Sequence, residues 1–287
     1  MQKLITVGIV TLAIAAFGQN APAPVAAENQ TAPAGEEVLK EGDKIIGFEL
    51  ETDFYSAYVW RGQICSHLPV FQPSPTIYAD FGDWGLIYAN AWMNFNLSKH
   101  YKPTQFAGLS EIDYEVGYEK EFEALNLAVG NVWYTYPHQS KRKEGPSTCE
   151  FFAKAEYKND FIVPSVAWYW DYSDVGGNDP DAMYFEFRLA RSFSLIEDKW
   201  DVEIGASTGL ANGAYLEYYS DGELNDAQFV TSCIDARTNY KICDCFSVGA
   251  SLGYHFQLSH SVRQSGYDCR DDYNQILVGG LHAKLEF

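Results

Sequence analysis

Basic residues are scarce in this sequence. Its 287 residues include 20 Lys and Arg against 39 Asp and Glu, which gives a formal net charge of −19 at pH 7. Nucleic acids are polyanions, so a protein with this balance of charge repels them. This excludes DNA and RNA as partners.

Long apolar runs are also missing after the first residues. No segment beyond residue 18 approaches the ~18 to 20 uninterrupted apolar residues that a transmembrane helix requires. Residues 4–17 form one apolar run, which follows Lys3 and ends among small residues, as in a secretory signal peptide. We therefore expect residues 1–18 to be a signal peptide, and residues 19–43, rich in Ala, Pro and Glu, to be a mobile periplasmic arm. Residues 44–287 have the length of a single large β domain.

In place of long runs, apolar and polar residues alternate. Side chains on a strand point to opposite faces in turn, so alternation predicts a wall with one apolar and one polar face. Between residues 45 and 61 the apolar face carries Ile46, Phe48, Leu50, Thr52, Phe54, Ser56, Tyr58 and Trp60, and the other face carries Glu49, Glu51, Asp53 and Arg61. Residues 111–119, 183–189 and 246–257 repeat this pattern, which is typical of a wall between lipid and a wet lumen. A half-buried strand of a soluble β-sandwich shows the same alternation.

Turn signals between the alternating runs predict about 12 strands. They begin near residues 45, 73, 84, 110, 124, 148, 161, 181, 200, 228, 244 and 274. The connections at 80–84, 157–160 and 239–245 are short, and those at 96–109, 137–147, 171–181, 211–227 and 259–273 are long. This segregation by length favours an all-β, transmembrane, antiparallel up-and-down barrel, closed between the first and the C-terminal strand, over a sandwich. Because proline cannot donate to a ladder, we expect Pro73, Pro75 and Pro164 at strand ends.

The last seven residues alternate as well. Leu281, Ala283, Leu285 and Phe287 oppose His282, Lys284 and Glu286. A terminal Phe on the lipid face resembles the signal that the barrel-insertion machinery reads, which predicts that machinery and outer-membrane lipid as partners. Aromatic residues gather at membrane interfaces, and we expect this role of Trp60, Tyr118, Trp170, Tyr254 and Phe287.

The predicted inward face is acidic. The residues expected to set selectivity in the lumen are Glu49, Glu51, Asp53, Arg61, Glu111, Asp113, Glu115, Glu186, Arg188, Glu203 and Asp235. Glu119, Glu150, Glu156 and Asp201 extend the acidic set, and Lys154, Arg237 and Lys284 offset it in part. An acidic lumen concentrates cations. Alternatively, the acidic and basic side chains pair and plug the tube, because 12 strands lie between a filled and an open barrel.

Signals for chemistry are weak. Carboxylates two residues apart on one face follow from an acidic lumen, so they do not indicate a glycosidase or a metal site. The six His residues lack metal-ligand spacing. Ser261 lies beside His260 without a Gly-x-Ser-x-Gly elbow. We expect no enzyme activity, no cofactor and no metal.

Six Cys are many for an exported barrel, where disulfides are permitted. Cys65 follows the first predicted strand and Cys269 lies in the last long connection, which closure of the ring brings together. This pair is the favoured disulfide. Cys149 is expected near the outer rim, Cys233 within a strand, and Cys243 and Cys245 in a short periplasmic turn.

Several of these segments resemble the TorF-like family of outer-membrane porins. Ser56, Tyr58, Val59, Trp60, Arg61 and Gly62 are similar to the first-strand signature of that family, with Ala57 in place of its acidic residue. Two further segments of this chain resemble strands of that family. One contains Glu111, Ile112, Asp113, Tyr114, Gly117 and Tyr118, and the other contains Tyr134, Thr135, Tyr136 and Pro137. The resemblance implies a porin-like barrel of unsettled substrate.

Together these features predict an outer-membrane channel for passive diffusion of small hydrophilic solutes, with a preference for cations. The alternative is a closed barrel with a binding or structural role through external loops such as 171–181. A barrel hydrolase that uses Ser261 is the third reading.

Overall fold

The computed structural model describes residues 45–98, 108–137, 148–173, 181–220, 222–265, 267 and 274–287. The predicted signal peptide and periplasmic arm lie outside these residues. Within them, strands account for most of the chain.

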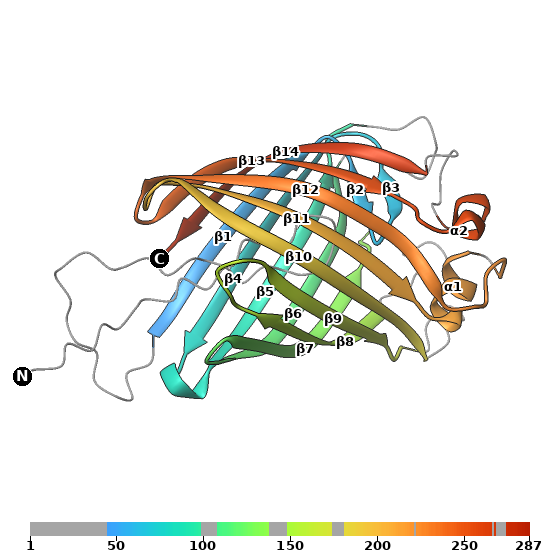
Figure 1. The fold of residues 1–287 in the computed structure, drawn as a ribbon, viewed down its shortest axis with the longest axis horizontal. Helices are drawn as coiled ribbons and strands as arrows, with labels where there is room; N and C mark the ends of the chain where they lie inside the picture. Colours follow the sequence, from blue (N-terminus) through green and yellow to red (C-terminus); the bar gives the residue numbers. More distant parts are fainter. Residues whose placement is uncertain are drawn as a thin grey trace, which may run out of the picture.

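Twelve strands form a closed barrel, which confirms the predicted fold (Figure 1). They are β1 (Ile45–Tyr55), β4 (Val70–Asp80), β5 (Leu86–Asn96), β6 (Gly108–Phe122), β7 (Leu125–Thr135), β8 (Thr148–Tyr157), β9 (Val163–Asp171), β10 (Ala182–Ile196), β11 (Trp200–Ala211), β12 (Gln228–Cys243), β13 (Phe246–Phe256) and β14 (Gln275–Glu286). Each strand pairs antiparallel with its neighbours, and β1 closes the ring on β14 from Glu49 opposite Glu286 to Tyr55 opposite Gly280.

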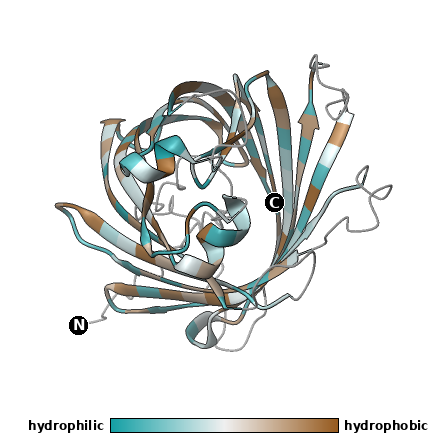
Figure 2. Ribbon diagram, turned by 90° about the vertical axis from the view of Figure 1, so that its right-hand side faces the viewer, coloured by the Kyte–Doolittle hydropathy of each residue, from teal (hydrophilic) through white to brown (hydrophobic). Residues whose placement is uncertain are grey.

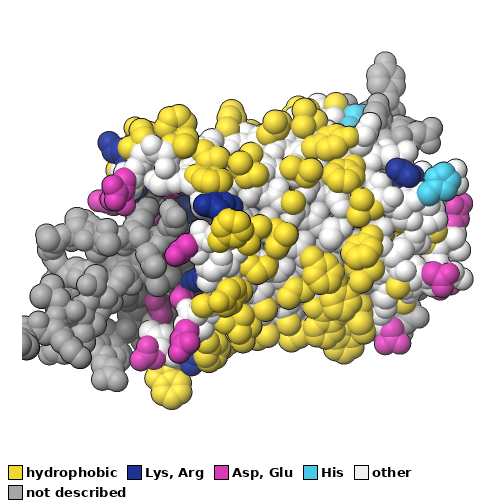
Figure 3. Space-filling view, in the orientation of Figure 1, with side chains coloured by type: hydrophobic (Ala, Val, Ile, Leu, Met, Phe, Trp, Pro, Cys, Tyr) yellow, Lys and Arg dark blue, Asp and Glu magenta, His cyan; other side chains and the backbone are white. Residues whose placement is uncertain are grey.

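The alternation of the sequence becomes an inside and an outside. On β6, Asp113 and Glu115 are buried, while Tyr114 and Val116 between and beside them are exposed on the outer surface. Apolar side chains cover the middle of the outer surface and charged ones gather toward its ends (Figure 3). Colouring by hydropathy shows the same change from residue to residue along the strands (Figure 2). A continuous apolar band around a closed ring requires lipid around it, so this is a membrane-spanning barrel and not a soluble sandwich.

The connections sort by length, as the sequence predicts. The end of the barrel where β14 finishes carries five turns of two to five residues, and we call it the short-turn end. The other end carries six connections of ten to eighteen residues, among them the helices α1 (Gly213–Tyr219) and α2 (His260–Gln264), and we call it the mouth (Figure 1). None of the helices in the described part of the chain has the length and apolar character to cross a membrane.

The first predicted strand is too long, because the chain leaves the wall after Tyr55. A bend at Ser56 and Ala57 leads into a small hairpin of β2 (Tyr58–Trp60) and β3 (Gln63–Ser66), which pair with each other and not with the wall. Arg61 and Gly62 form its tip with φ of 47° and 86°, the left-handed conformation of tight hairpin turns.

This hairpin overturns the prediction for Trp60. Its side chain is only 9% exposed and contacts the rings of Tyr134 and Tyr219, with centroids 6.0 and 5.4 Å away. It therefore lies inside the barrel and not at a membrane interface. Tyr118, Tyr254 and Phe287 are 38%, 39% and 70% exposed, and the Trp170 ring stacks on Trp168. Their role as membrane anchors stays a prediction.

Two of the three prolines are also placed wrongly by the sequence. Pro164 lies at the start of β9, as expected, but Pro73 and Pro75 lie in the middle of β4. The ladder between β4 and β1 continues past them, whereas the ladder between β4 and β5 stops at Phe71 and resumes at Thr76. The missing N–H groups therefore interrupt pairing on one side of the strand only.

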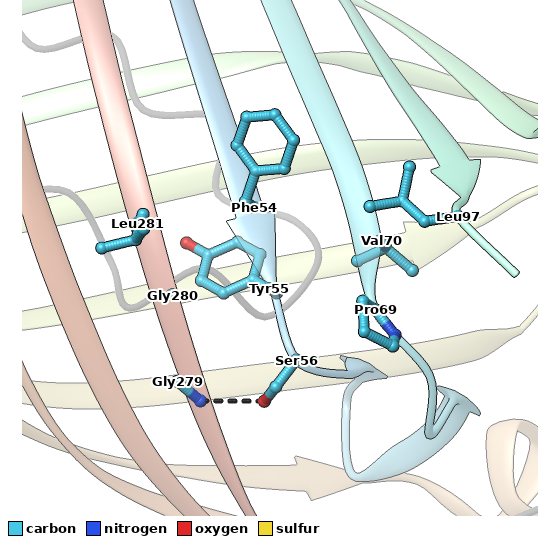
Figure 4. A pocket seen from close by; sticks show the side chains of 9 residues that line it. All are labelled: Phe54, Tyr55, Ser56, Pro69, Val70, Leu97, Gly279, Gly280 and Leu281. Carbon is cyan, nitrogen blue, oxygen red and sulfur yellow. Dashed lines mark hydrogen bonds between the residues drawn. The ribbon is translucent and has the colours of Figure 1, made fainter.

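At Ser56 the chain leaves the barrel wall, and the pairing between β1 and β14 ends there. The Ser56 backbone N–H donates to the Gly279 carbonyl at 2.9 Å, and the Gly279 N–H donates to the Ser56 hydroxyl at 3.0 Å. From these two bonds toward the mouth, β1 no longer lies between β14 and β4. Figure 4 shows the pocket at this point, lined mainly by apolar residues that include Phe54, Val70 and Leu281.

Candidate functional site: the barrel lumen

An ion pair fixes the hairpin tip to the opposite wall of the barrel. Two terminal nitrogens of Arg61, Nη1 and Nη2, donate to the two carboxylate oxygens of Glu150 on β8 at 2.7 and 2.6 Å. The Tyr134 hydroxyl donates to the same carboxylate at 2.8 Å. The strands β4, β5, β6 and β7 lie between β1 and β8 on one side of the ring, so this contact crosses the lumen.

Aromatic rings surround the Arg61 guanidinium. Its central carbon lies 4.7 Å from the ring centroid of Trp60, 4.4 Å from that of Tyr169 and 4.5 Å from that of Tyr184. Rings at this distance attract a cation through their electron-rich faces. Burial lowers the pKa of Arg61, but the Glu150 carboxylate, Tyr215 and Tyr134 together raise it by more, so the pKa lies well above its usual value. The Arg61 side chain is therefore permanently charged, and we call its ion pair with Glu150 the Arg61 pin.

The rest of the hairpin packs against the long connections at the mouth. Val59 and Ile64 of the hairpin are buried in one cluster with Leu216 of α1 and Val262 of α2. The Tyr267 hydroxyl donates to the Arg61 carbonyl at 2.8 Å. Seen from the mouth, the two short helices lie within the outline of the ring (Figure 2). The hairpin and the long connections together narrow this half of the lumen.

Below the hairpin, basic residues on alternate strands pair with acidic ones. Arg188 on β10 reaches Glu203 on β11 at 2.8 Å and Asp235 on β12 at 2.6 Å. These three side chains are at most 5% exposed. The other pairs are Arg237 with Glu51, Arg237 with Asp53 at 3.9 Å, Lys284 with Glu49 at 2.8 Å, and Lys154 with Glu115 at 3.7 Å. These residues form a belt of paired charges around the lumen wall.

Other inward carboxylates remain outside this belt. Among the described residues, Glu111, Glu119, Glu156 and Glu186 form no ion pair with Lys or Arg. Glu111 accepts a hydrogen bond from Tyr58 of the hairpin at 3.1 Å, and Glu119 accepts one from Asn126. Along β6 the inward side chains change from buried at Glu111 to half-buried at Glu119. The lumen is therefore wetter toward the short-turn end.

The predicted selectivity residues all face the interior. Ten of them lie on wall strands: Glu49, Glu51, Asp53, Glu111, Asp113, Glu115, Glu186, Arg188, Glu203 and Asp235. Arg61 reaches the interior from the hairpin instead. The sequence did not reveal which side chains pair, nor the ring of inward tyrosines formed by Tyr58, Tyr88, Tyr134, Tyr169 and Tyr184, which are all buried. For Tyr169 and Tyr184 the available signal was the carboxylate two residues further along the same strand face, Asp171 and Glu186.

The other candidate chemistry finds little support in the geometry. The Ser261 hydroxyl donates to the Gln228 side chain at 2.6 Å and contacts the Ser259 hydroxyl at 2.7 Å. Within the described ranges no group of three His, Cys, Asp or Glu could hold a metal ion. Cys65 is half-buried and Cys269 lies outside the described residues, so the favoured disulfide stays a prediction.

No family model matches this chain, and no curated protein matches it either. Among solved structures, the chain is similar to the COG4313 outer membrane channel from Pseudomonas putida F1, with 13% identity and a TM-score of 0.47 over 90% of this chain and 100% of that one. It is similar to the NanC porin, with 8% identity and a TM-score of 0.49 over 83% and 98% of the two chains. Outer membrane phospholipase A from Escherichia coli gives 10% identity and a TM-score of 0.45 over 83% and 92%.

Similarity this low does not assign a function. The resemblance to the TorF-like family is not confirmed by these comparisons.

Proposed function

We propose that this protein is an outer-membrane channel through which small hydrophilic solutes diffuse passively, with a preference for cations. The excess of carboxylates over basic groups on the inner surface of the closed barrel carries this proposal. The inward basic residues of the described part are Arg61, Lys154, Arg188, Arg237 and Lys284, and each has an acidic partner. The carboxylates outside these pairs leave the lumen with net negative charge.

The excess of carboxylates affects the passage of ions because it lies on the wall of a narrow lumen. Fixed charges in a narrow tube with low-dielectric walls concentrate ions of the opposite sign and deplete ions of the same sign. Glu119, Glu156 and Glu186 are only partly buried, so solutes in the lumen can approach them. Cations are therefore favoured over anions of similar size.

The hairpin supports a small size limit. A ring of twelve strands lies between barrels that side chains fill and wide porins. The Arg61 pin and the aromatic residues around it occupy the half of the lumen near the mouth. Only small solutes would pass beside them.

Planar-bilayer recording of the purified protein tests the proposal. We expect discrete conductance steps and, under a salt gradient, a reversal potential that indicates cation preference. Replacing the three partly buried carboxylates in Glu119→Gln, Glu156→Gln and Glu186→Gln should reduce that preference. The matched control removes three carboxylates from exposed turns, in Asp83→Asn, Glu197→Gln and Asp198→Asn, and should change the preference much less.

A folded, inserted barrel that conducts no current would overturn the proposal. That result would favour a closed barrel with a binding or structural role, for which the packing of the hairpin against the mouth is the supporting observation.

A further inference from the structure

Two thiols lie side by side on the turn between β12 and β13. Cys243 is the last residue of β12, and Cys245 is the second residue of the two-residue turn that follows. Their Sγ atoms are 3.5 Å apart, and both side chains are exposed. This turn belongs to the short-turn end, which is expected to face the periplasm.

Contacts on three sides hold the turn in place. The Lys241 Nζ lies 3.1 Å from the Asp244 carboxylate, and the Lys241 N–H donates to the carbonyl of Lys199 in the neighbouring turn at 2.8 Å. The Cys245 carbonyl accepts from the N–H of Glu286 on β14 at 3.1 Å. The two thiols are therefore kept together by the backbone, without a long flexible connection between them.

A structural role does not explain this pair. A disulfide stabilises a fold mainly by closing a loop in the unfolded chain, and the loop here spans only three residues. A structural zinc site needs four ligands, and within the described residues no group of three His, Cys, Asp or Glu could hold a metal ion; the Asp244 carboxylate between the thiols pairs with Lys241. Exchange between thiols and disulfides needs two exposed neighbouring thiols and nothing more.

We propose that Cys243 and Cys245 form a redox-active dithiol that exchanges with the disulfide of a periplasmic partner. The Cys243 thiolate attacks one sulfur of the partner disulfide, which forms a mixed disulfide and releases the first partner thiolate. The Cys245 thiolate then attacks the Cys243 sulfur, which forms the Cys243–Cys245 bond and releases the second. Two electrons pass to the partner. The two protons of the Cys243 and Cys245 thiols end on the two partner thiolates, so the partner leaves as a dithiol.

The hydrogen bond to Cys243 raises the pKa of the Cys245 thiol, and either thiol can be the donor in this bond. The products of the exchange are the same whichever of the two thiols attacks first. This inference is independent of whether the barrel conducts ions.

Treatment of the folded, full-length protein with oxidised glutathione tests the proposal. After blocking of free thiols with iodoacetamide and digestion, the peptide that contains both cysteines should be two hydrogen atoms lighter and unalkylated. Reduction with dithiothreitol should restore both alkylation sites. Cys233 is the internal control, because it is buried on the lumen side and should not react.

Single substitutions sharpen the test. In Cys243→Ser and in Cys245→Ser, the single remaining thiol has no neighbour to complete the exchange and should stop at a mixed disulfide with glutathione. Heat-dependent mobility on gels verifies that each variant is folded. The proposal is overturned if the wild-type pair stays fully alkylatable, if both thiols carry glutathione, or if either bonds to another cysteine of the chain.

Discussion

Arg61 and Glu150 hold the two sides of the lumen together. Arg61 lies at the tip of a hairpin that leaves the wall beside β1, and Glu150 lies on β8, with two charge-assisted hydrogen bonds of 2.7 and 2.6 Å between them. Their side chains are 5% and 2% exposed. Because the pair is buried, removing one partner leaves the other charge without compensation, which weakens the attachment of the hairpin to β8.

Arg61→Asn should release the hairpin and enlarge the pore. Asn tolerates the positive φ of this position, so the substitution removes the guanidinium while the turn keeps its geometry. Breaking a buried pair costs about 3–5 kcal/mol. We expect larger single-channel conductance and faster entry of sugars in liposome swelling.

Lys158→Gln is the control. It breaks a partly exposed pair with Glu121, should cost only about 0–1 kcal/mol of stability and should leave conductance unchanged. Unchanged conductance in folded Arg61→Asn would show that the hairpin does not limit passage.

Gly205→Ala should weaken the belt of paired charges. The Arg188 guanidinium crosses β11 over Gly205 to reach Asp235 on β12, and a Cβ at residue 205 would overlap that guanidinium. Arg188 would have to move, which strains its bonds to Glu203 and Asp235. We expect a loss of about 1–3 kcal/mol in the free energy of unfolding, measured by urea titration in detergent. Gly279→Ala is the control, because nothing lies within 4 Å of its added Cβ. Equal effects of the two changes would contradict this role of Gly205.

The strand pattern was readable from the sequence because lipid and lumen impose it. Every wall strand begins within three residues of its predicted start, and the lengths of the connections separate the two ends as expected. The hairpin was missed because Tyr58 and Trp60 continue the alternation of β1. Only the tight turn at Arg61 and Gly62 distinguishes the segment, and Arg is an unusual residue at that position.

The pairing inside the lumen depends on geometry that the sequence does not contain. Arg188 reaches across β11 because residue 205 has no side chain, and Arg61 meets Glu150 because the hairpin crosses the barrel. The prolines of β4 were misplaced for a similar reason. A neighbouring strand can supply side-chain bonds where the backbone cannot, and Asn90 does so here.

Loss of the side-chain amide of Asn90 should destabilise the barrel. Its Nδ2 donates to the Ser74 hydroxyl at 2.8 Å, the Thr76 hydroxyl at 2.7 Å and the Pro75 carbonyl at 3.2 Å, beside the interrupted ladder. Asn90→Ala should reduce the free energy of unfolding by about 1–3 kcal/mol. Urea titration measures the change, with Asn126→Ala at the wetter end as the control. Equal stability of Asn90→Ala and the wild type would show that these bonds do not stabilise the wall.

Leu252→Arg tests whether lipid surrounds the barrel. Leu252 lies near the middle of β13 on the outer surface and is 51% exposed, whereas its neighbour Ser251 faces the interior and is 9% exposed. An Arg facing the centre of a bilayer costs about 2–4 kcal/mol. We expect slower and less complete folding into liposomes for Leu252→Arg than for Leu252→Ala, scored by heat-dependent mobility. In detergent micelles, where the charged end can reach water more easily, the two variants should differ less. If they fold equally well into liposomes, this face does not contact the hydrocarbon core, and the membrane-spanning assignment of β13 is wrong.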